Sequence, residues 1–290
     1  MFHALRVDVD YLKFRSGQLQ ICRQFMAQRG VMEVMTPLLR RFTGTDPHVD
    51  SFRVGDYYLQ TSPELSMKIL LAHSSGDIYQ LSPVFRDEPV QGPYHQSEFL
   101  MLEWYRLNMN ERELAQEVVE LIQRLGVNYN AEYHDLRGLF LSFYKEDLWL
   151  ISDDVLVMLT KTHVDVSCDL HRQDHIDLLI DHMIRILNIP LLVITGFPKS
   201  MQLMARFDQV QEIAKRFEVY VRGYEIANGF YELNDASAQR ERMVKDNQLR
   251  TALKKPVVEL DEEFLLAVGR LPDCSGVALG LDRLTWLLLD

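Results

Sequence analysis

Near the N-terminus, apolar residues recur at the spacing of one helix face. They are Leu19, Cys22, Phe25 and Met26. This spacing predicts an amphipathic helix over residues 15–29. Gly30 stands where a left-handed residue commonly ends a helix, and a short strand over residues 31–35 runs into Pro37.

Two further helices are indicated by residues that cap helix N-termini. Residues 62–64, Ser-Pro-Glu, combine an N-cap residue, a proline of the first turn and an early acid, so a helix should run to about His73. Asn110 with Glu113 has the spacing of a capping box. The helix that it begins carries a periodic apolar face and is closed by Gly126.

The strands predicted from aromatic and β-favouring runs follow one another with few helices between them. They cover residues 79–85, 99–105, 191–195, 217–222, 224–233 and 277–281, whereas residues 127–190 are mostly helical in pattern. Consecutive strands predict an antiparallel sheet with helices to one side. The fold class expected is therefore α+β.

Alternation along residues 99–105 separates two kinds of side chain. One face carries Phe99, Met101, Glu103 and Tyr105, and the other carries Leu100, Leu102 and Trp104. A carboxylate and a phenol beside an aromatic ring could surround a cationic group. Without other evidence, an aromatic residue on a strand belongs more often to the core than to a ligand site.

Composition limits the class of protein. The 290 residues are 47% apolar and 25% charged, which is ordinary for one sizeable globular domain. The net charge of -11 argues against a broad nucleic-acid surface. Three separated cysteines give neither a metal spacing nor a disulfide framework. With no signal peptide and no apolar span, we expect a cytoplasmic protein that does not enter a membrane.

Three acids lie seven residues apart in the segment 216–235. They are Glu218, Glu225 and Glu232, with Gly223 between the first two. Gly223 allows a turn, so Glu218 and Glu225 could face each other on neighbouring strands as oxygen ligands of Mg²⁺. Acids on exposed strands are more often only solvated. Asn228 and Gly229 fit a hairpin turn as well as they fit a binding role.

Two arginines in separate blocks carry the strongest signal. Arg86 lies in FRDE, followed by HQSEFLMLEW, and Arg283 lies in GVALGLDRL. A guanidinium can hold carboxylate or phosphate oxygens with two donors. Taken alone, each arginine would more often form a surface ion pair, with Asp87 or Asp282. Together, and in this order, the blocks resemble motifs two and three of class II aminoacyl-tRNA synthetases, which bind ATP.

Longer blocks extend this resemblance to the catalytic domain of lysyl-tRNA synthetase. These blocks are TSPELSMKILL, FRDE with HQSEFLMLEWY, RFEVYVRGYEIANGFYELNDA and CSGVALGLDRL. By position, the resemblance implies that Arg86, Glu88, His95, Phe99 and Arg283 contact ATP. It implies that Glu218 and Glu225 lie beside ATP and hold its metal. It places Glu64, Glu103, Tyr105, Asn228, Phe230 and Glu232 around the lysine substrate.

Two departures are shared with a shorter branch. Only about 15 residues precede the first helix, whereas a lysyl-tRNA synthetase carries an OB-fold anticodon-binding domain there. Ala278 replaces a glycine of motif three, and one methyl can reshape an amino-acid pocket. Both features, with QTSPE and KRFEVYVRG, resemble the elongation factor P (R)-β-lysine ligases. That family adenylates β-lysine with ATP and Mg²⁺ and transfers it to the ε-amino group of a lysine on elongation factor P.

The resemblance implies a single catalytic domain over residues 1–290, homodimeric, without an OB-fold domain and without anticodon-dependent tRNA binding. The alternatives are a paralogue that transfers lysine to tRNA or another amine, and an inactive synthetase-like regulator. The choice between α-lysine and (R)-β-lysine is open, and Glu64 and Ala278 are where it should be decided. The end at Asp290 fits either a short member or a truncated sequence.

Overall fold

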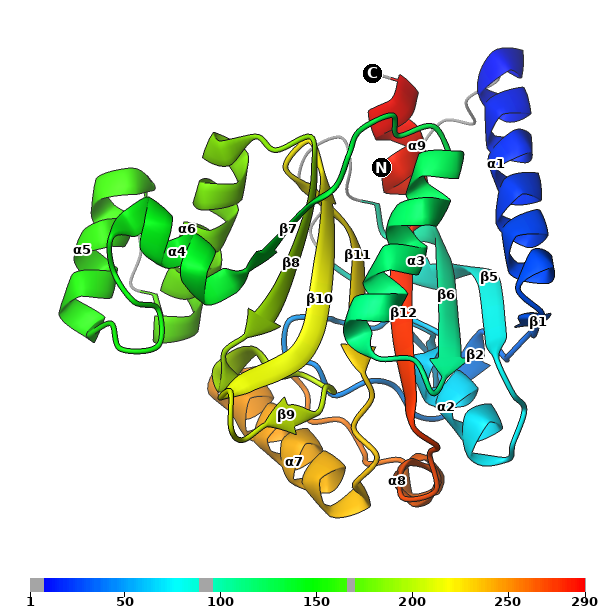
Figure 1. Cartoon of the computed structure of the whole chain (residues 1–290). Coiled ribbons are helices and arrows are strands. Elements are labelled where there is room, and N and C mark those ends of the chain that lie inside the picture. The colour runs from blue at the N-terminus through cyan, green and yellow to red at the C-terminus, as the bar shows by residue number, and fades with distance from the viewer. Residues whose placement is uncertain (1–7, 89–95, 166–169, 290) are drawn as a thin grey trace.

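A mixed sheet forms the centre of the molecule (Figure 1). The computed structural model describes residues 8–88, 96–165 and 170–289. Within these residues the sheet has nine strands in the order β1-β5-β6-β12-β11-β10-β8-β7, with β9 paired to β10. The strands are β1 (Met32–Glu33), β5 (Ile78–Phe85), β6 (Glu98–Leu107), β7 (Glu132–Asp135), β8 (Leu191–Phe197), β9 (Phe207–Asp208), β10 (Ile213–Val221), β11 (Tyr224–Tyr231) and β12 (Cys274–Gly280). The central pairs are antiparallel, as predicted, whereas the edge pairs β1–β5 and β7–β8 are parallel.

Helices and a second small sheet surround the central sheet. The helices are α1 (Val9–Gln28), α2 (Glu64–Ala72), α3 (Glu111–Arg124), α4 (Leu136–Tyr144), α5 (Asp153–His163), α6 (Arg172–Leu187), α7 (Ala236–Ala252), α8 (Glu262–Val268) and α9 (Leu281–Leu289), with a 3-10 turn at Lys199–Met201. The small sheet has the order β2-β4-β3, formed by Leu39–Arg40, Tyr57–Leu59 and Arg53–Val54. None of the helices in the described ranges is long and apolar enough to cross a bilayer.

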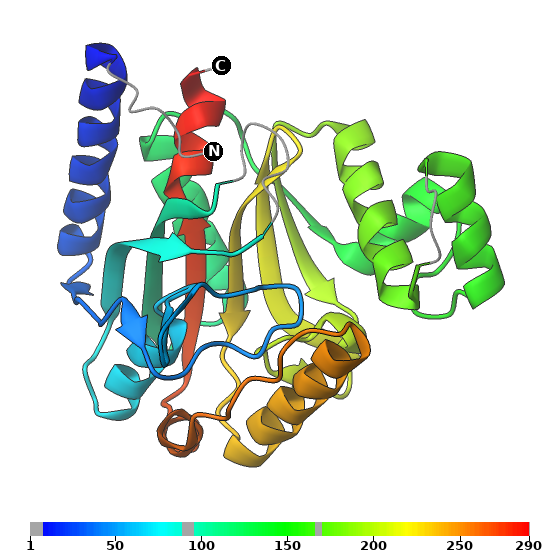
Figure 2. The same cartoon turned by 180° about the vertical axis from the view of Figure 1, so that it is seen from behind.

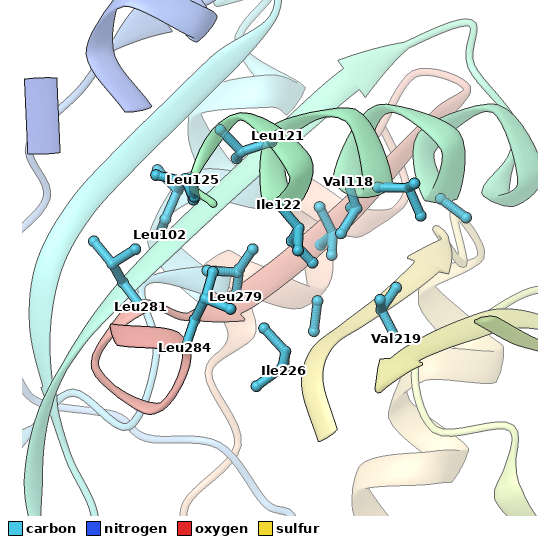
Figure 3. Packing of buried hydrophobic residues seen from close by; sticks show 14 of the residues in the cluster. Leu102, Val118, Leu121, Ile122, Leu125, Val219, Ile226, Leu279, Leu281 and Leu284 are labelled. Atoms are coloured by element: carbon cyan, nitrogen blue, oxygen red, sulfur yellow. The ribbon is translucent and has the colours of Figure 1, made fainter. Parts of the chain in front are cut away.

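The main core lies between one face of the sheet and helices α1, α3 and α9. Helix α3 begins with the predicted capping box, in which Asn110 Oδ1 accepts from Glu113 N at 3.0 Å and Glu113 Oε2 accepts from Asn110 N at 2.8 Å. Its apolar face packs against strand residues such as Leu102 and Leu279 (Figure 3). Because this face is dry and closely packed, it fixes the positions of the strands that carry polar residues on the other side.

Helices also cover the opposite face, so the prediction that they lie to one side is wrong. Leu191 and Val193 point into the main core, while Leu192 and Ile194 pack with α4, α5 and α6 in a second core. Tyr105 likewise packs with α2, away from its neighbour Trp104. A strand that is buried on both faces needs cover on both, and the helices α4–α6 form a separate lobe beside β7 and β8 (Figure 1).

Three local predictions also differ from the structure. Helix α1 begins at Val9, earlier than residue 15, because Asp8 caps it with Oδ1 2.9 Å from Asp10 N. The short edge strand β7 lies in the region predicted as helical. Asn228 and Gly229 lie within β11, so the hairpin-turn alternative for them is wrong. The turn that Gly223 was predicted to allow is present, with Arg222 and Gly223 both at positive φ.

Candidate active site

Two adjoining cavities open on the sheet face opposite α3. The acidic cavity, of about 200 Å³, contains Glu64, Glu103 and Glu232 in its lining. The arginine cavity, of about 330 Å³, contains Arg86 and Arg283. They share the residues Asp46, Val49, Arg86, Met101, Asn228 and Ala278. Residues that are far apart in sequence thus meet along one continuous hollow.

A buried lysine lies at the floor of the acidic cavity. Lys68, on α2, has a side chain that is 1% exposed, and its Nζ lies 2.7 Å from Glu64 Oε1 and 2.7 Å from Glu232 Oε2. Burial alone would lower the pKa of Lys68, but Glu232 and Glu64 outweigh burial and raise the pKa above its ordinary value. Sequence reasoning missed Lys68. The i, i+4 spacing from Glu64 was the available signal.

Glu103 and Tyr105 also line the acidic cavity. They lie on the same face of β6, as the alternation along residues 99–105 predicted. Tyr105 donates its hydroxyl hydrogen to Glu103 Oε1 at 2.8 Å. Burial and then repulsion from Glu64 raise the pKa of Glu103 to about 8. Burial also raises the pKa of Glu232 to about 7, although Lys68 lowers it. When ionised, three carboxylates around one internal ammonium leave an excess of two negative charges in this cavity.

Two strand positions of β12 shape the acidic cavity. A Cβ on Gly276 would overlap the Tyr105 ring and lie 2.5 Å from Glu232 Oε1, so only glycine allows both side chains to approach. Ala278 is paired with Glu103 on β6 and with Asn228 on β11. Since Ala278 lines both cavities, its methyl group lies at the seam between them.

Unpaired polar atoms around the acidic cavity are mainly acceptors. Glu103 Oε2 and Asn228 Oδ1 are buried and have no hydrogen-bond partner among the described residues. Phe230 adds an aromatic face to the same lining. Buried acceptors without donors are costly, so this cavity is suited to a ligand that brings N–H groups.

The arginine cavity holds two guanidinium groups, beside the acids Asp46, Glu88 and Glu225. Arg86 lies over the ring of Phe99, 5.2 Å from its centroid, and Arg86 Nε is buried without a hydrogen-bond partner in the described structure. Arg283 donates from Nη1 to the Glu225 carbonyl at 2.6 Å. Burial lowers the pKa of Arg283, Glu225 opposes this, and Arg86 adds to it. Two close cations with unused donors suit an anionic ligand.

The predicted metal acids do not face each other as expected. A register shift between Val219 and Tyr220 pairs Glu218 with Asn228 and Glu225 with Tyr220. Glu218 accepts hydrogen bonds from Arg216 and Tyr220, and sequence reasoning missed Arg216 as its partner. A bulge of this kind leaves no clear sequence signal.

Glu225 nevertheless lies close enough to Glu218 for the two charges to interact. Burial, and then Glu218, raise the pKa of Glu225 to about 7. A divalent cation would relieve that repulsion. In the described residues no group of three or more potential metal ligands occurs, but Mg²⁺ on a polyphosphate commonly takes only one or two carboxylates. Glu225 and Glu218 therefore fit such an ion bound together with phosphate oxygens.

The remaining predicted residues are divided between the cavities and the undescribed segment. Glu64 lines the acidic cavity, and Glu88 lines the arginine cavity. Burial raises the pKa of Glu88, while Arg86 lowers it. His95 lies outside the described residues. Twelve of the residues that the sequence singled out thus line the two cavities, and Glu218 lies outside both linings, bonded to Arg216 and Tyr220. Their chemical roles stay predictions.

A loop over residues 43–52 covers the seam and was not predicted. Arg250, at the end of α7, donates to the carbonyls of Asp46 at 2.9 Å and Val49 at 3.4 Å and to Asp50 Oδ1 at 3.0 Å. The carbonyl of Asp50 in turn accepts from Asp87 N at 2.8 Å. The loop therefore ties α7 to the segment that carries Arg86.

Comparison with known proteins decides the family. Residues 7–290 match tRNA synthetases class II (D, K and N). The chain is 36% identical to the elongation factor P (R)-beta-lysine ligase of Hamiltonella defensa, over 97% of this chain and 92% of that protein. It is 39% identical to the protein of that name from Proteus mirabilis, over 92% and 87%, and 37% identical to that from Haemophilus ducreyi, over 98% and 91%. The chain belongs to this ligase family within class II.

Membership confirms the fold class and the ligase class that the motifs predicted. ATP use follows from the class, because class II ligases of this kind activate a carboxylate with ATP. The arginine cavity beside an acidic cavity is consistent with that requirement.

Replacement of Lys68 by Met should destabilise the protein by about 3–5 kcal/mol, because two buried carboxylates would lose their shared counter-ion. Urea unfolding measures this loss. Lys13→Met is the matched control, since Lys13 is 73% exposed and should change stability by less than about 0.5 kcal/mol. The double variant Lys68→Met with Glu232→Gln should recover part of the loss. Equal stability of the Lys68 variant and wild type would contradict the coupling.

Binding of a diammonium ligand should strengthen as pH rises from 6 to 8. The raised pKa values of Glu103, about 8, and Glu232, about 7, mean that both carry protons at low pH, while a diammonium ligand favours their ionised forms. Binding therefore releases protons, and the affinity should rise by at least about tenfold. Calorimetry in buffers of different ionisation enthalpy measures the release, which Glu103→Gln should reduce. A pH-independent affinity without proton release would refute this.

Proposed function

We propose that this chain activates (R)-β-lysine, or lysine, with ATP as an aminoacyl adenylate and transfers it to the ε-amino group of a lysine on elongation factor P. The excess of two negative charges that Glu64, Glu103 and Glu232 would leave over Lys68, once a cationic ligand holds all three ionised, carries the proposal. It matches the two ammonium groups of a lysine isomer, while Arg86 at the seam matches the carboxylate. The acceptor is supported by the similarity to ligases of elongation factor P from Hamiltonella defensa and Proteus mirabilis.

Activation needs positioning more than acid–base chemistry. The attacking carboxylate is already ionised at neutral pH, so no protein base is required. Arg86 would hold that carboxylate near the α-phosphate and spread the charge that develops between them. Phe99 would stack on adenine, Glu88 would contact the nucleotide, and Arg283 would bind the far end of the triphosphate. When bound by Glu218 and Glu225, Mg²⁺ would neutralise phosphate charge.

The assembly and the acceptor remain part of this proposal. A homodimer is supported by exposed apolar residues around β1 and β2, among them Met32, Leu39 and Met35, which is 93% exposed. A single catalytic domain acting in the cytoplasm, without anticodon-dependent tRNA binding, agrees with the acidic composition.

Incubation of the chain with elongation factor P, ATP, Mg²⁺ and either lysine isomer should add one lysyl unit to the factor, measured by intact-protein mass spectrometry. Arg86→Ala should slow adenylation by at least about a hundredfold, because the seam loses its charged donor. Arg240→Ala, which removes an exposed ion pair with Glu262, is the control and should leave the rate unchanged.

Two outcomes would redirect this proposal. Pyrophosphate exchange without addition to the factor would favour tRNA or another amine as the acceptor. Absence of exchange with every lysine isomer would favour an inactive synthetase-like regulator.

Ala278→Gly should shift the preference toward α-lysine by about tenfold in relative kcat/KM. The two isomers differ by one carbon in the position of an amino group, and the methyl of Ala278 lies between Glu103 and Asn228 where that group would bind. Pyrophosphate exchange with each isomer measures the ratio. Ala252→Gly, at the exposed end of α7, is the control. An unchanged ratio would show that Ala278 does not select the isomer.

A further inference from the structure

One acid occupies the seam between the two cavities. Among the six described residues that line both of them, the charged ones are Arg86 and Asp46. The seam is where a carboxylate in the acidic cavity meets a phosphate in the arginine cavity. With the substrates bound as proposed above, Asp46 would lie beside the carbon that is first activated and then attacked.

The carboxylate of Asp46 has a backbone partner and, among the described residues, no side-chain partner. Its Oδ1 accepts from the backbone N of His48 at 2.8 Å, and its side chain is partly exposed. In residues 8–88, 96–165 and 170–289, no basic side chain lies within 4.0 Å of it as an ion-pair partner. By contrast, its backbone carbonyl is held by Arg250 Nη1 at 2.9 Å. The main chain is fixed, while the carboxylate has no side-chain partner among the described residues.

The other acids around the cavities already have partners or lie elsewhere. Glu64 and Glu232 hold Lys68, Glu103 accepts from Tyr105, Glu218 accepts from Arg216 and Tyr220, and Asp246 accepts from Thr45 and Arg242. Glu88 and Glu225 line the arginine cavity alone. Of the acids in the described residues, Asp46 is the one that lines both cavities, and its position singles it out.

Amide formation requires a proton acceptor that adenylation does not. The neutral amine of the acceptor attacks the acyl carbon of the adenylate and a C–N bond forms. The C–O bond to AMP breaks, and its electron pair stays on the phosphate oxygen. One N–H proton must then leave the new amide nitrogen.

We propose that Asp46 accepts this proton as the general base of the transfer step. The inference rests on the proposed function, since it assumes that the adenylated amino acid is passed to an amine. The loop of residues 43–52 lies over the sheet beside the segment that follows α7, where Lys255 Nζ also binds the Pro47 carbonyl at 2.8 Å (Figure 2). Tethering at both Arg250 and Lys255 pre-positions Asp46, so the carboxylate needs little reordering when the acceptor arrives.

Asp46→Asn tests the assignment, with the two half-reactions measured separately. Pyrophosphate exchange with (R)-β-lysine and trapping of the adenylate by hydroxylamine should stay within about twofold of wild type. Single-turnover transfer from the preformed adenylate should fall by at least about a hundredfold, the usual contribution of a general base. Transfer is measured to elongation factor P and to the free amine Nα-acetyllysine amide. Asp56→Asn, on an exposed turn, is the matched control and should leave both steps unchanged.

The outcomes separate this inference from the proposed function. A parallel loss of exchange and transfer would show that Asp46 binds the amino acid, and unchanged transfer would show that it is not the base; either result overturns the inference. If wild type acylates the free amine but not elongation factor P, the proposed acceptor is wrong. The rate of the Asn variant on the free amine then still decides the role of Asp46.

Discussion

The ion cluster of Lys68 with Glu64 and Glu232 is the constraint on which the site depends. Each of these charges would cost several kcal/mol to bury alone, so α2 and the end of β11 must stay docked with both carboxylates on one ammonium. This docking fixes the floor of the acidic cavity and brings Glu232 close to β12, where only Gly276 leaves room. The same cluster sets the charge of the cavity, because one internal cation offsets one of three acids.

The face of the sheet under α3 is an apolar core, whereas the cavities that contain the candidate site residues open on the other face. Strand β6 places Leu102 and Trp104 in the dry core under α3 and places Glu103 and Tyr105 in the acidic cavity. A polar face in the middle of a sheet is tolerated here because its groups bond one another and enclose a ligand space. Close packing on the α3 side, together with the apolar clusters at α2 and at α4–α6 on the other face, holds the strands in register, so the polar side chains keep their spacing.

Local patterns were predictable and long-range pairings were not. Alternation along β6 and the capping box of α3 follow from adjacent residues, so the sequence predicts them directly. The contact of Lys68 with Glu232 joins distant segments, and the register shift beside Tyr220 adds one residue that no periodicity marks. The edge strand β7 is too short to show an alternation. Most site residues were located through motif resemblance, which carries long-range geometry that spacing alone does not.

Adenylation and transfer need different chemical groups in the same two cavities, and different elements of the fold carry these groups. Activation uses a carboxylate that is already ionised, so it is served by side chains such as Arg86 that extend from the rigid sheet and its flank. Transfer needs a group that takes up a proton, and the carboxylate of Asp46 lies on the 43–52 loop. Arg250 holds that loop largely through backbone carbonyls. Substitution of the Asp46 side chain therefore leaves these carbonyl contacts, and the ion pairs of Asp50 with Arg250 and Lys255, in place to hold the loop.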